Sequence, residues 1–340
     1  MKASSLDEVY TSVNPEAEII YVVPLIRYSH KKSDYLYLLY EELIESQKYR
    51  IESVSVFNHF KLITGKLTRK NAILHYHWLE FQDLKSLMGM PWKLCCICLF
   101  KLLGGNIVWT LHNEFPHDQK YLKLHSFLHR KMASWADALH VHCSSAVKTM
   151  SEKLHAQTEK FWLVEHPDFP ANPTLKNKAK KYLNNEYGIQ FRSKFPVFLM
   201  FGNISRYKQI EKVAESIIEE NLDCTLVIAG PVKKGNNELY KELEMLAEQD
   251  QRIHLVPRFI PEKHVSWFYS ASDICVFNYR EILSSGGYHM AKAYKKTVIA
   301  PDMGCLSDEK NKPMIHLFKS QKEMVEMLRG QITTFLHGKD

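Results

Sequence analysis

Two segments in the second half of the chain combine basic and small residues in patterns suited to holding phosphate. Residues 201–209 read FGNISRYKQ, which places Arg206 and Lys208 just after an apolar run that ends at Gly202. Basic side chains at the junction between a strand and a helix can pair with the oxygens of a diphosphate. The alternative interpretation is a solvated loop that carries two surface cations.

The second segment, SSGG at residues 284–287, precedes an expected helix that begins near Tyr288. Glycine lets a ligand approach the backbone closely, and the first turn of a helix offers free N–H groups and a dipole that favours anions. The alternative is a flexible turn with a serine helix cap. We expect the second phosphate contact to come from Ser284, Ser285, Gly286 and Gly287.

Motifs of several other enzyme classes do not occur in the sequence. There is no GxGxxG after a strand, no GxxxxGK[ST] and no GxSxG, which disfavours dinucleotide oxidoreductases, P-loop ATPases and the usual α/β-hydrolases. There is also no Asp-x-Asp pair, the common carboxylate device for holding the metal of a nucleotide. We therefore expect neither a bound metal nor a cofactor, and a diphosphate neutralised by basic side chains and backbone N–H groups.

These segments must be positioned by an α/β fold, because short apolar runs rich in β-forming residues alternate with helical patterns. In the first half we expect strands at residues 18–24, 51–57, 72–78, 106–112, 138–143 and 161–166. After a polar stretch containing prolines, the alternation restarts with strands at 196–202, 224–230, 253–259, 274–279 and 297–301. The pattern predicts two Rossmann-like domains that face each other across a cleft, where the carboxyl ends of the strands hold the ligands.

The predicted domain organisation follows from that alternation. We expect a first Rossmann-like domain, a linker, a second Rossmann-like domain and a C-terminal helix that packs back on the first domain. Their residues are 1–170, 171–190, 191–318 and 319–340.

Composition limits the partners and the compartment. The chain has 340 residues and a net charge of +7, which suits anionic ligands or a membrane surface. The basic residues are spread among acidic ones, so we expect no nucleic acid. Seven cysteines, an odd number, favour buried thiols in a reduced compartment. Cys95, Cys96 and Cys98 lack the spacing of a zinc site.

A stretch at residues 90–105 is apolar but too short to span a bilayer. It is either an amphipathic helix that contacts a membrane or a core helix. The N-terminus is polar and lacks a signal peptide. We therefore expect a cytoplasmic protein, peripheral on the inner face of the membrane.

The two phosphate segments together resemble the C-terminal domain of GT-B glycosyltransferases, especially family 4-like enzymes of polysaccharide assembly. The likeness rests on GNISRYKQ, on LVIAGP at 226–231 and on the spacing to SSGG and the later TVIAP. It implies that Asn203, Arg206 and Lys208 bind the donor and that the amides at 285–287 donate to its phosphates. It also implies that Phe259, within VPRFIP at 256–261, lies against the nucleotide base.

The chain departs from that family before the expected helix. Many family 4 enzymes carry two glutamates there, the second of which usually holds the ribose. Glu281 is close to the first position, whereas His289 and Met290 occupy the region of the second. The resemblance therefore leaves Glu281 as a donor-binding candidate.

The first domain also resembles this group. LHYHWLE at 74–80 and VWTLHNEFPH at 108–117 match an HW pair and a later T-x-HN…PH segment that end adjacent strands. The likeness implies that His77, His112, Asn113 and His117 meet sugar hydroxyls or the leaving group, work that suits imidazole near neutral pH. A histidine is as readily structural, which is the role we expect for His140 and His142.

The resemblance implies a glycosyltransferase that moves a sugar from a nucleoside diphosphate sugar to a hydroxyl of a glycan or lipid-linked acceptor, with retention of anomeric configuration. Retention requires no protein base, whereas inversion does. Besides His112, Glu114 and Asp118 are the nearest candidates for that base. A nucleotide-sugar hydrolase or epimerase, or a two-lobed binding protein, are the alternatives.

Overall fold

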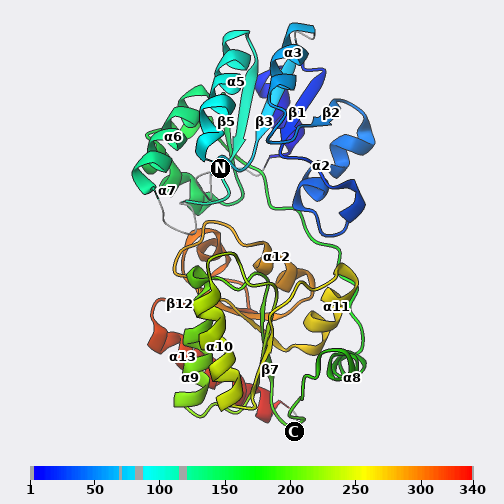
Figure 1. Cartoon of the computed structure of the whole chain (residues 1–340), viewed down its shortest axis with the longest axis vertical. Coiled ribbons are helices and arrows are strands. Elements are labelled where there is room, and N and C mark those ends of the chain that lie inside the picture. Colours follow the sequence, from blue (N-terminus) through cyan, green and yellow to red (C-terminus); the bar gives the residue numbers. More distant parts are fainter. Residues whose placement is uncertain (1–3, 69–70, 81–86, 115–120, 339–340) are drawn as a thin grey trace. The chain divides into compact units, whose positions relative to one another are not determined.

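The structure is a computed structural model that describes residues 4–68, 71–80, 87–114 and 121–338. It divides into two compact units, Met1–Pro167 and Asp168–Asp340. Figure 1 shows that each unit is built from a sheet with helices on its faces. We describe each unit separately.

The described residues of the first unit form a six-stranded parallel sheet in the order β2-β1-β3-β4-β5-β6. Its strands are β1 (Ile19–Val23), β2 (Arg50–Ser53), β3 (Ala72–Tyr76), β4 (Asn106–Thr110), β5 (Ala138–Val141) and β6 (Phe161–Leu163). Its α-helices are α1 (Leu6–Val13), α2 (Tyr35–Ser46), α3 (Phe60–Thr68), α5 (Met90–Leu102), α6 (Leu122–Trp135) and α7 (Ser144–Leu154). The short 3-10 helices are η1 (Tyr28–His30) and η2 (Thr158–Lys160).

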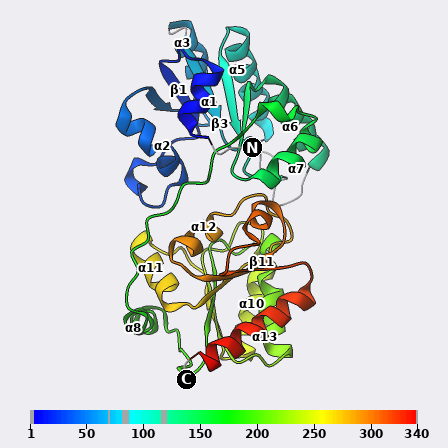
Figure 2. The ribbon, with the colours of Figure 1, turned by 180° about the vertical axis from the view of Figure 1, so that it is seen from behind.

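Helices cover both faces of this sheet, which explains why β1, β3 and β5 are buried along their whole length. On one face, Tyr10 of α1 and Tyr40 of α2 join the core formed with Ile20 of β1. Figure 2 brings α1 to the front of this sheet. On the other face, the ring of Phe100 in α5 packs edge-on against Tyr21 of β1, with 6.4 Å between ring centroids.

The described residues of the second unit form another six-stranded parallel sheet, in the order β12-β11-β10-β7-β8-β9. Its strands are β7 (Val197–Phe201), β8 (Thr225–Ala229), β9 (Ile253–Val256), β10 (Ile274–Val276), β11 (Thr297–Pro301) and β12 (Ile315–Phe318). Its α-helices are α8 (Lys176–Tyr187), α9 (Ile210–Glu219), α10 (Asn237–Gln249), α11 (Glu262–Ala271), α12 (Gly286–Ala293) and α13 (Gln321–His337). The short helices are η3 (Arg206–Lys208) and η4 (Gly304–Glu309).

Two cores sandwich this second sheet. One core joins residues of α9, α10 and α13 to alternate strand residues such as Phe198 and Ile228. The other joins residues of α8, α11 and α12 to the intervening strand residues, such as Leu199 and Val227. This alternation is the two-residue period of strands covered on both faces. The predicted α/β class with two Rossmann-like sheets is confirmed.

Each strand expected from the sequence is present, as β1 to β11, whereas β12 and α1 were not predicted. The segment expected as a linker, 171–190, belongs to the second unit, because α8 within it packs on α11. The C-terminal helix α13 buries Met324, Leu328 and Ile332 in the core of the second unit. It therefore needs no contact with the first domain to cover its apolar face.

Candidate functional site

A small pocket lies where the strand order of the second sheet reverses. From β7 the chain continues to β8 and β9 on one side, whereas β10, β11 and β12 lie on the other. Ligands of open parallel sheets bind at such a switch point, beyond the carboxyl ends of the strands. The pocket is lined there by Met200, Phe201, Gly202, Lys208, Ile210, Val276, Phe277, Asn278 and Tyr279.

Glycines make room at this edge of the sheet. Gly202 follows β7 with a φ of 102°, and a Cβ there would lie 3.0 Å from Nζ of Lys208. Gly230 follows β8 with a φ of 146°, and a Cβ there would lie 2.3 Å from the carbonyl oxygen of Gly202. Both positions therefore favour glycine for their backbone conformation, and Gly230 also requires it for space.

Lys208 brings a positive charge into the pocket. It ends η3, and its ammonium lies 3.4 Å from the carbonyl oxygen of Phe201. Burial lowers the pKa of Lys208 from 10.5 to about 8. An anion in the pocket would compensate for the lost hydration of the ammonium, so the site favours a negatively charged ligand.

This pKa predicts how donor affinity depends on pH. A bound diphosphate favours the protonated form of Lys208, so donor binding is strongest below pH 8. Above pH 8, Lys208 of the free protein is mostly neutral and must take up a proton when the donor binds. Affinity for a nucleoside diphosphate sugar should fall roughly tenfold between pH 7 and pH 9. Calorimetric titration measures it. Lys208→Arg should bind equally at both values, because arginine stays charged, and a fall of the same size in that variant would contradict the explanation.

The predicted contacts Asn203 and Arg206 lie in the same loop, but Arg206 is already paired. Its guanidinium makes a bidentate ion pair with Glu242 of α10, at 2.6 and 2.7 Å. Asn203 is exposed. Arg206 would have to exchange this partner to reach a phosphate, and its role in donor binding stays a prediction.

The first turn of α12 lies beside the pocket. Ser285 caps the helix by accepting from the backbone N–H of Tyr288 at 3.2 Å, and its hydroxyl lies 2.8 Å from that of Tyr279 in the pocket lining. A Cβ on Gly287 would lie 3.1 Å from the ring of Phe277. A Cβ on Gly286 would meet nothing within 4 Å. The helix start is thus placed where its amides can face an anion.

The loops after β7 and β10 are fastened to each other. The backbone N–H of Arg280 donates to the carbonyl oxygen of Tyr207 at 2.8 Å. The side-chain amide of Asn278 donates to the carbonyl oxygen of Gln209 at 3.2 Å. These bonds hold the loop that carries Lys208 against the loop that leads from β10 to the SSGG segment, and the joint role of Lys208 and SSGG in donor binding stays a prediction.

Three other predicted donor contacts, Glu281, Ser284 and Phe259, are not among the residues that line the pocket. Glu281 and Ser284 are partly buried in the loop between β10 and α12. Phe259 is 73% exposed after β9, which is separated from β7 by β8. These three assignments stay predictions.

In the first unit, polar side chains form two rows across the sheet face that α1 and α2 cover. Because side chains alternate along a strand, His75 and His77 at β3 share this face with Thr110 and His112 at β4. At β5, His140 and His142 lie on the same face. The first row is His75, Thr110 and His140, and the second, nearer the carboxyl edge, is His77, His112 and His142.

The second row ends in a partly open aromatic cluster. Nδ1 of His77 lies 3.1 Å from Nε2 of His112, and the indole of Trp78 stacks on the His112 ring with 4.2 Å between centroids. Tyr35 of α2 packs edge-on against His112 and hydrogen-bonds to Nε2 of His142 at 2.8 Å. Trp78 is 37% exposed, so the cluster offers a flat ring and an imidazole to a ligand.

These histidines are neutral at ordinary pH. Burial lowers the pKa of His142 to about 3, helped by the nearby His166. Burial also holds the pKa of His77 and His112 well below 6.5, with neighbouring imidazoles adding to the effect. Each ring therefore has one N–H donor and one acceptor nitrogen.

Carboxylates at this edge have defined partners. The side-chain amide of Asn113 donates to Glu80 at 3.1 and 3.3 Å. Glu114, a predicted base candidate, forms an ion pair with Lys153 of α7. The candidates His117 and Asp118 lie outside the described residues. Glu80 was not singled out from the sequence and is a further carboxylate at the strand ends.

Tyr35 and Tyr40 were not singled out from the sequence, and Trp78 was noted only as part of the HW pair. The alternating patterns H-x-H, T-x-H and H-x-H at 75–77, 110–112 and 140–142 were the available signal. These patterns predict that the side chains lie together on one face of the sheet, but only when it is known that the three strands are neighbours. Within the described residues, no group of three or more His, Cys, Asp or Glu side chains is arranged to hold a metal ion.

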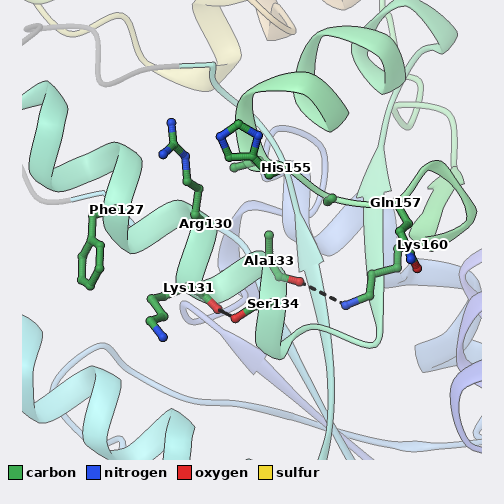
Figure 3. Close-up of a pocket in the computed structure, with 10 residues that line it drawn as sticks. Phe127, Arg130, Lys131, Ala133, Ser134, His155, Gln157 and Lys160 are labelled. Atoms are coloured by element: carbon green, nitrogen blue, oxygen red, sulfur yellow. Dashed lines mark hydrogen bonds between the residues drawn. The ribbon is translucent and has the colours of Figure 1, made fainter.

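A separate surface depression, drawn in Figure 3, lies between the end of α6 and the segment after α7. Phe127, Arg130 and Lys131 of α6 line one side of it, and His155 and Lys160 line the other. Its lining residues precede β5 and β6 in the chain, so they are not those of the second histidine row at the carboxyl edge. Lys160 donates there to the carbonyl oxygen of Ala136 at 2.9 Å and so caps α6.

Tandem α/β units, each with a parallel sheet covered on both faces, and a pocket at the switch point of the second sheet are the architecture of the GT-B fold. No family model matches the chain. Over 84% of its length it is 23% identical to GDP-mannose:glycolipid 4-beta-D-mannosyltransferase of Xanthomonas campestris pv. campestris, of which it covers 76%.

Solved structures share the fold over almost the whole chain. Sucrose-phosphate synthase from Thermosynechococcus elongatus is similar with a TM-score of 0.69 and 13% identity, over 94% of this chain and 90% of that one. Anabaena HepE, solved in complex with UDP and glucose, has a TM-score of 0.65 and 12% identity, over 94% and 92%. With the mannosyltransferase similarity, this fold makes the chain a glycosyltransferase of the GT-B architecture.

Proposed function

We propose that this glycosyltransferase moves a hexose from a nucleoside diphosphate sugar to a hydroxyl of a lipid-linked saccharide, without a bound metal. The observation that carries the proposal is the pocket between β7 and β10, which Lys208 lines and whose lining residue Tyr279 contacts Ser285 at the start of α12. Two features of the similar proteins support it. HepE was solved with UDP and glucose, and the Xanthomonas relatives are named for a GDP-mannose donor and a glycolipid acceptor.

The chemistry required of the second unit is stabilisation of the leaving diphosphate. As the bond between C1 of the sugar and the diphosphate oxygen breaks, negative charge grows on that oxygen. Lys208 and the amides of Gly286 and Gly287 are preorganised to receive the charge, which lowers the barrier without a metal. In the first unit, His112 and Asn113 are the groups proposed to hold sugar hydroxyls, whereas both ring nitrogens of the buried His77 are already bonded, to Tyr40 and to His112.

The stereochemical outcome has two candidates. Retention is the outcome implied by the family 4 resemblance, and it requires no protein base. The relatives are named for a β-mannosyl product, and a β product from an α-linked nucleotide donor requires inversion. Inversion needs a base, for which Glu80, held by Asn113, and Glu114, paired with Lys153, are described carboxylates at the strand ends. The anomeric configuration of the product, read by NMR, decides between them.

A transfer assay tests the proposed function. The protein is incubated in EDTA with each of a panel of labelled nucleoside diphosphate hexoses and with a lipid extract that contains saccharide-linked lipids. Label should move into the lipid fraction with one donor. Release of free sugar without lipid labelling would favour the alternative hydrolase, and no turnover of any donor would favour the binding protein.

A lipid-linked acceptor suggests that the first unit meets a membrane. In the described part of the chain, no helix has the length and apolar character needed to cross one. Helices α3 and α5 nevertheless expose Phe60, Leu67, Trp92, Leu99 and Leu102 to solvent. The rings of Phe60 and Trp92 stack with 6.5 Å between centroids, so the two helices share one apolar face. We propose that this face docks on the inner surface of the cytoplasmic membrane.

Flotation with liposomes containing anionic lipid tests the docking face. The wild-type protein should float with the liposomes, and Trp92→Glu and Phe60→Glu should each lower the bound fraction at least about tenfold, because each places a charge where an aromatic ring would be buried. Met245→Glu, on an exposed position of α10 in the second unit, is the matched control and should float normally. Wild-type protein that stays at the bottom would contradict the proposal.

A further inference from the structure

A chain of buried hydrogen bonds connects His112 to the interior of the first unit. It runs from His112 through His77 to Tyr40 of α2, and from Tyr40 to His75. From His75 it continues through Thr110 and His140 to the carbonyl oxygen of Val164. Every imidazole in this chain of hydrogen bonds is neutral and so has one N–H donor and one acceptor nitrogen. The direction of each hydrogen bond therefore follows from the one before it, starting at the carbonyl oxygen of Val164.

The carbonyl end fixes the first directions. The oxygen of Val164 only accepts, so Nε2 of His140, at 3.0 Å, carries a hydrogen. Nδ1 of His140 must then accept from the hydroxyl of Thr110 at 2.8 Å. The oxygen of Thr110 accepts in turn from Nε2 of His75 at 2.7 Å. This leaves Nδ1 of His75 as an acceptor with one lone pair.

Two tyrosines compete for that lone pair. The hydroxyls of Tyr10 and Tyr40 both lie 2.5 Å from Nδ1 of His75. The hydroxyls lie 3.4 Å from each other, a long contact. Tyr40 has a second good partner, Nε2 of His77 at 3.0 Å. The hydroxyl of Tyr10 has one hydrogen, and it makes the shorter of its two contacts, 2.5 Å against 3.4 Å, when it donates to His75 and not to Tyr40. Tyr40 then donates to His77.

The arrangement determines the state of His112. With Nε2 of His77 accepting from Tyr40, the hydrogen of His77 is on Nδ1 and is donated to Nε2 of His112 at 3.1 Å. The hydrogen of His112 is then on Nδ1. Among the described residues, Nδ1 of His112 has no hydrogen-bond partner, and the residue is only partly buried. This N–H is therefore available to a ligand.

We propose that Tyr10 and Tyr40 are positioning residues that hold His112 in the tautomer protonated on Nδ1, so that His112 donates a hydrogen bond to an oxygen of the sugar substrate. The inference deepens the proposed function, on which its reference to substrate rests. It makes His112 a hydrogen-bond donor and not the base that removes the proton from the acceptor hydroxyl. Burial, which keeps the pKa of His112 low, also makes it a poor base.

Removing one distant hydroxyl should reverse the tautomer. In Tyr10→Phe, Tyr40 becomes the donor to His75, and its oxygen accepts from Nε2–H of His77. Nδ1 of His77 then accepts from Nε2–H of His112. Nitrogen NMR of protein labelled with ¹⁵N-histidine reads the tautomer, and a His112→Gln sample assigns the resonances. The expected result is Nδ1–H for His112 in the wild type and Nε2–H in Tyr10→Phe.

The wild-type spectrum is decisive even where Tyr10→Phe does not fold, because Nε2–H on His112 in the wild type would overturn the proposal. An unchanged tautomer in folded Tyr10→Phe would also overturn it. The spectra need no substrate. A protein with the expected tautomers but no sugar transfer would contradict the proposed function alone, and transfer by a wild type with His112 protonated on Nε2 would contradict this inference alone.

Activity gives a second readout. Asparagine places an amide N–H near the position of Nδ1 of histidine, whereas glutamine places one near Nε2. His112→Asn should therefore keep more transfer activity than His112→Gln, and Tyr10→Phe should lose about tenfold in turnover, as expected for one hydrogen bond. Equal losses in the asparagine and glutamine variants would count against a donor at Nδ1.

Discussion

Replacement of Lys208 by methionine is expected to lower sugar transfer by roughly 100- to 1000-fold, the usual cost of removing one preorganised group that stabilises a developing oxyanion. Its ammonium is partly buried beside β7, so its attraction for a departing diphosphate is weakly screened by solvent. Methionine keeps the unbranched apolar stem and removes only the charge. The measurement is the initial rate of transfer at saturating donor.

Lys212→Met provides a matched control. Lys212 is an exposed lysine on α9, and its loss changes the net charge equally. Its transfer rate should stay within about twofold of the wild type, because exposed positions tolerate substitution. The Lys208→Met protein should unfold at no lower temperature than the wild type, since the burial that lowers the pKa of Lys208 disfavours its charged form. A stable Lys208→Met protein with a near-normal rate would contradict the role assigned to Lys208.

The first unit is expected to lose stability steeply as the pH falls from 6.5 towards 3. Burial lowers the pKa of His75 and of His142 to about 3, against an ordinary value of 6.5. Below pH 6.5 these histidines bind protons in the unfolded chain but not in the folded unit. The free energy of unfolding therefore has its full value above pH 6.5 and falls as the pH is lowered below it. At pH 5 each of these two histidines should lower the free energy of unfolding by roughly 2 kcal/mol. Their combined effect is a large share of the roughly 5–15 kcal/mol by which folded proteins are typically stable.

Urea unfolding at pH 7.5 and pH 5.0, followed by tryptophan fluorescence, measures this loss. The signal comes mainly from the first unit, because Trp267 is the one tryptophan of the six that belongs to the second. His142→Gln removes one of the titrating groups and should reduce the difference between the two pH values. Equal unfolding midpoints of the wild type at both pH values would contradict the neutral, buried histidine rows.

The sequence predicted the sheet architecture because strand periodicity is local. Apolar runs bounded by glycine and proline located β1 to β11, and the restart of the alternation after residue 188 indicated the second domain. β12 was missed because Ile315–Phe318 is short and only partly buried over most of its length. The glycine-rich start of α12 and Lys208 were both found from the local residue types.

What the sequence could not show depends on pairing between distant segments. Arg206 was assigned to phosphate, but its bidentate partner Glu242 lies 36 residues away, on another helix. His140 was expected to be structural, and its hydrogen bonds to Thr110 and Val164 agree with that role. The hydrogen bonds of His140 connect to His112 only because β3, β4 and β5 are neighbours in the sheet and because Tyr10 of α1 packs against the face that they share. Sheet order and register are needed to see it.

The pocket between β7 and β10 is proposed to bind a nucleoside diphosphate without a metal. Thermal unfolding in EDTA, with UDP, GDP, ADP and CMP in turn, measures this binding. One nucleoside diphosphate should raise the melting temperature, by a stabilisation of about 2.7 kcal/mol at 100 times its Kd, and Lys208→Met should abolish the shift. No shift with any nucleotide, or a shift that requires a divalent cation, would contradict it.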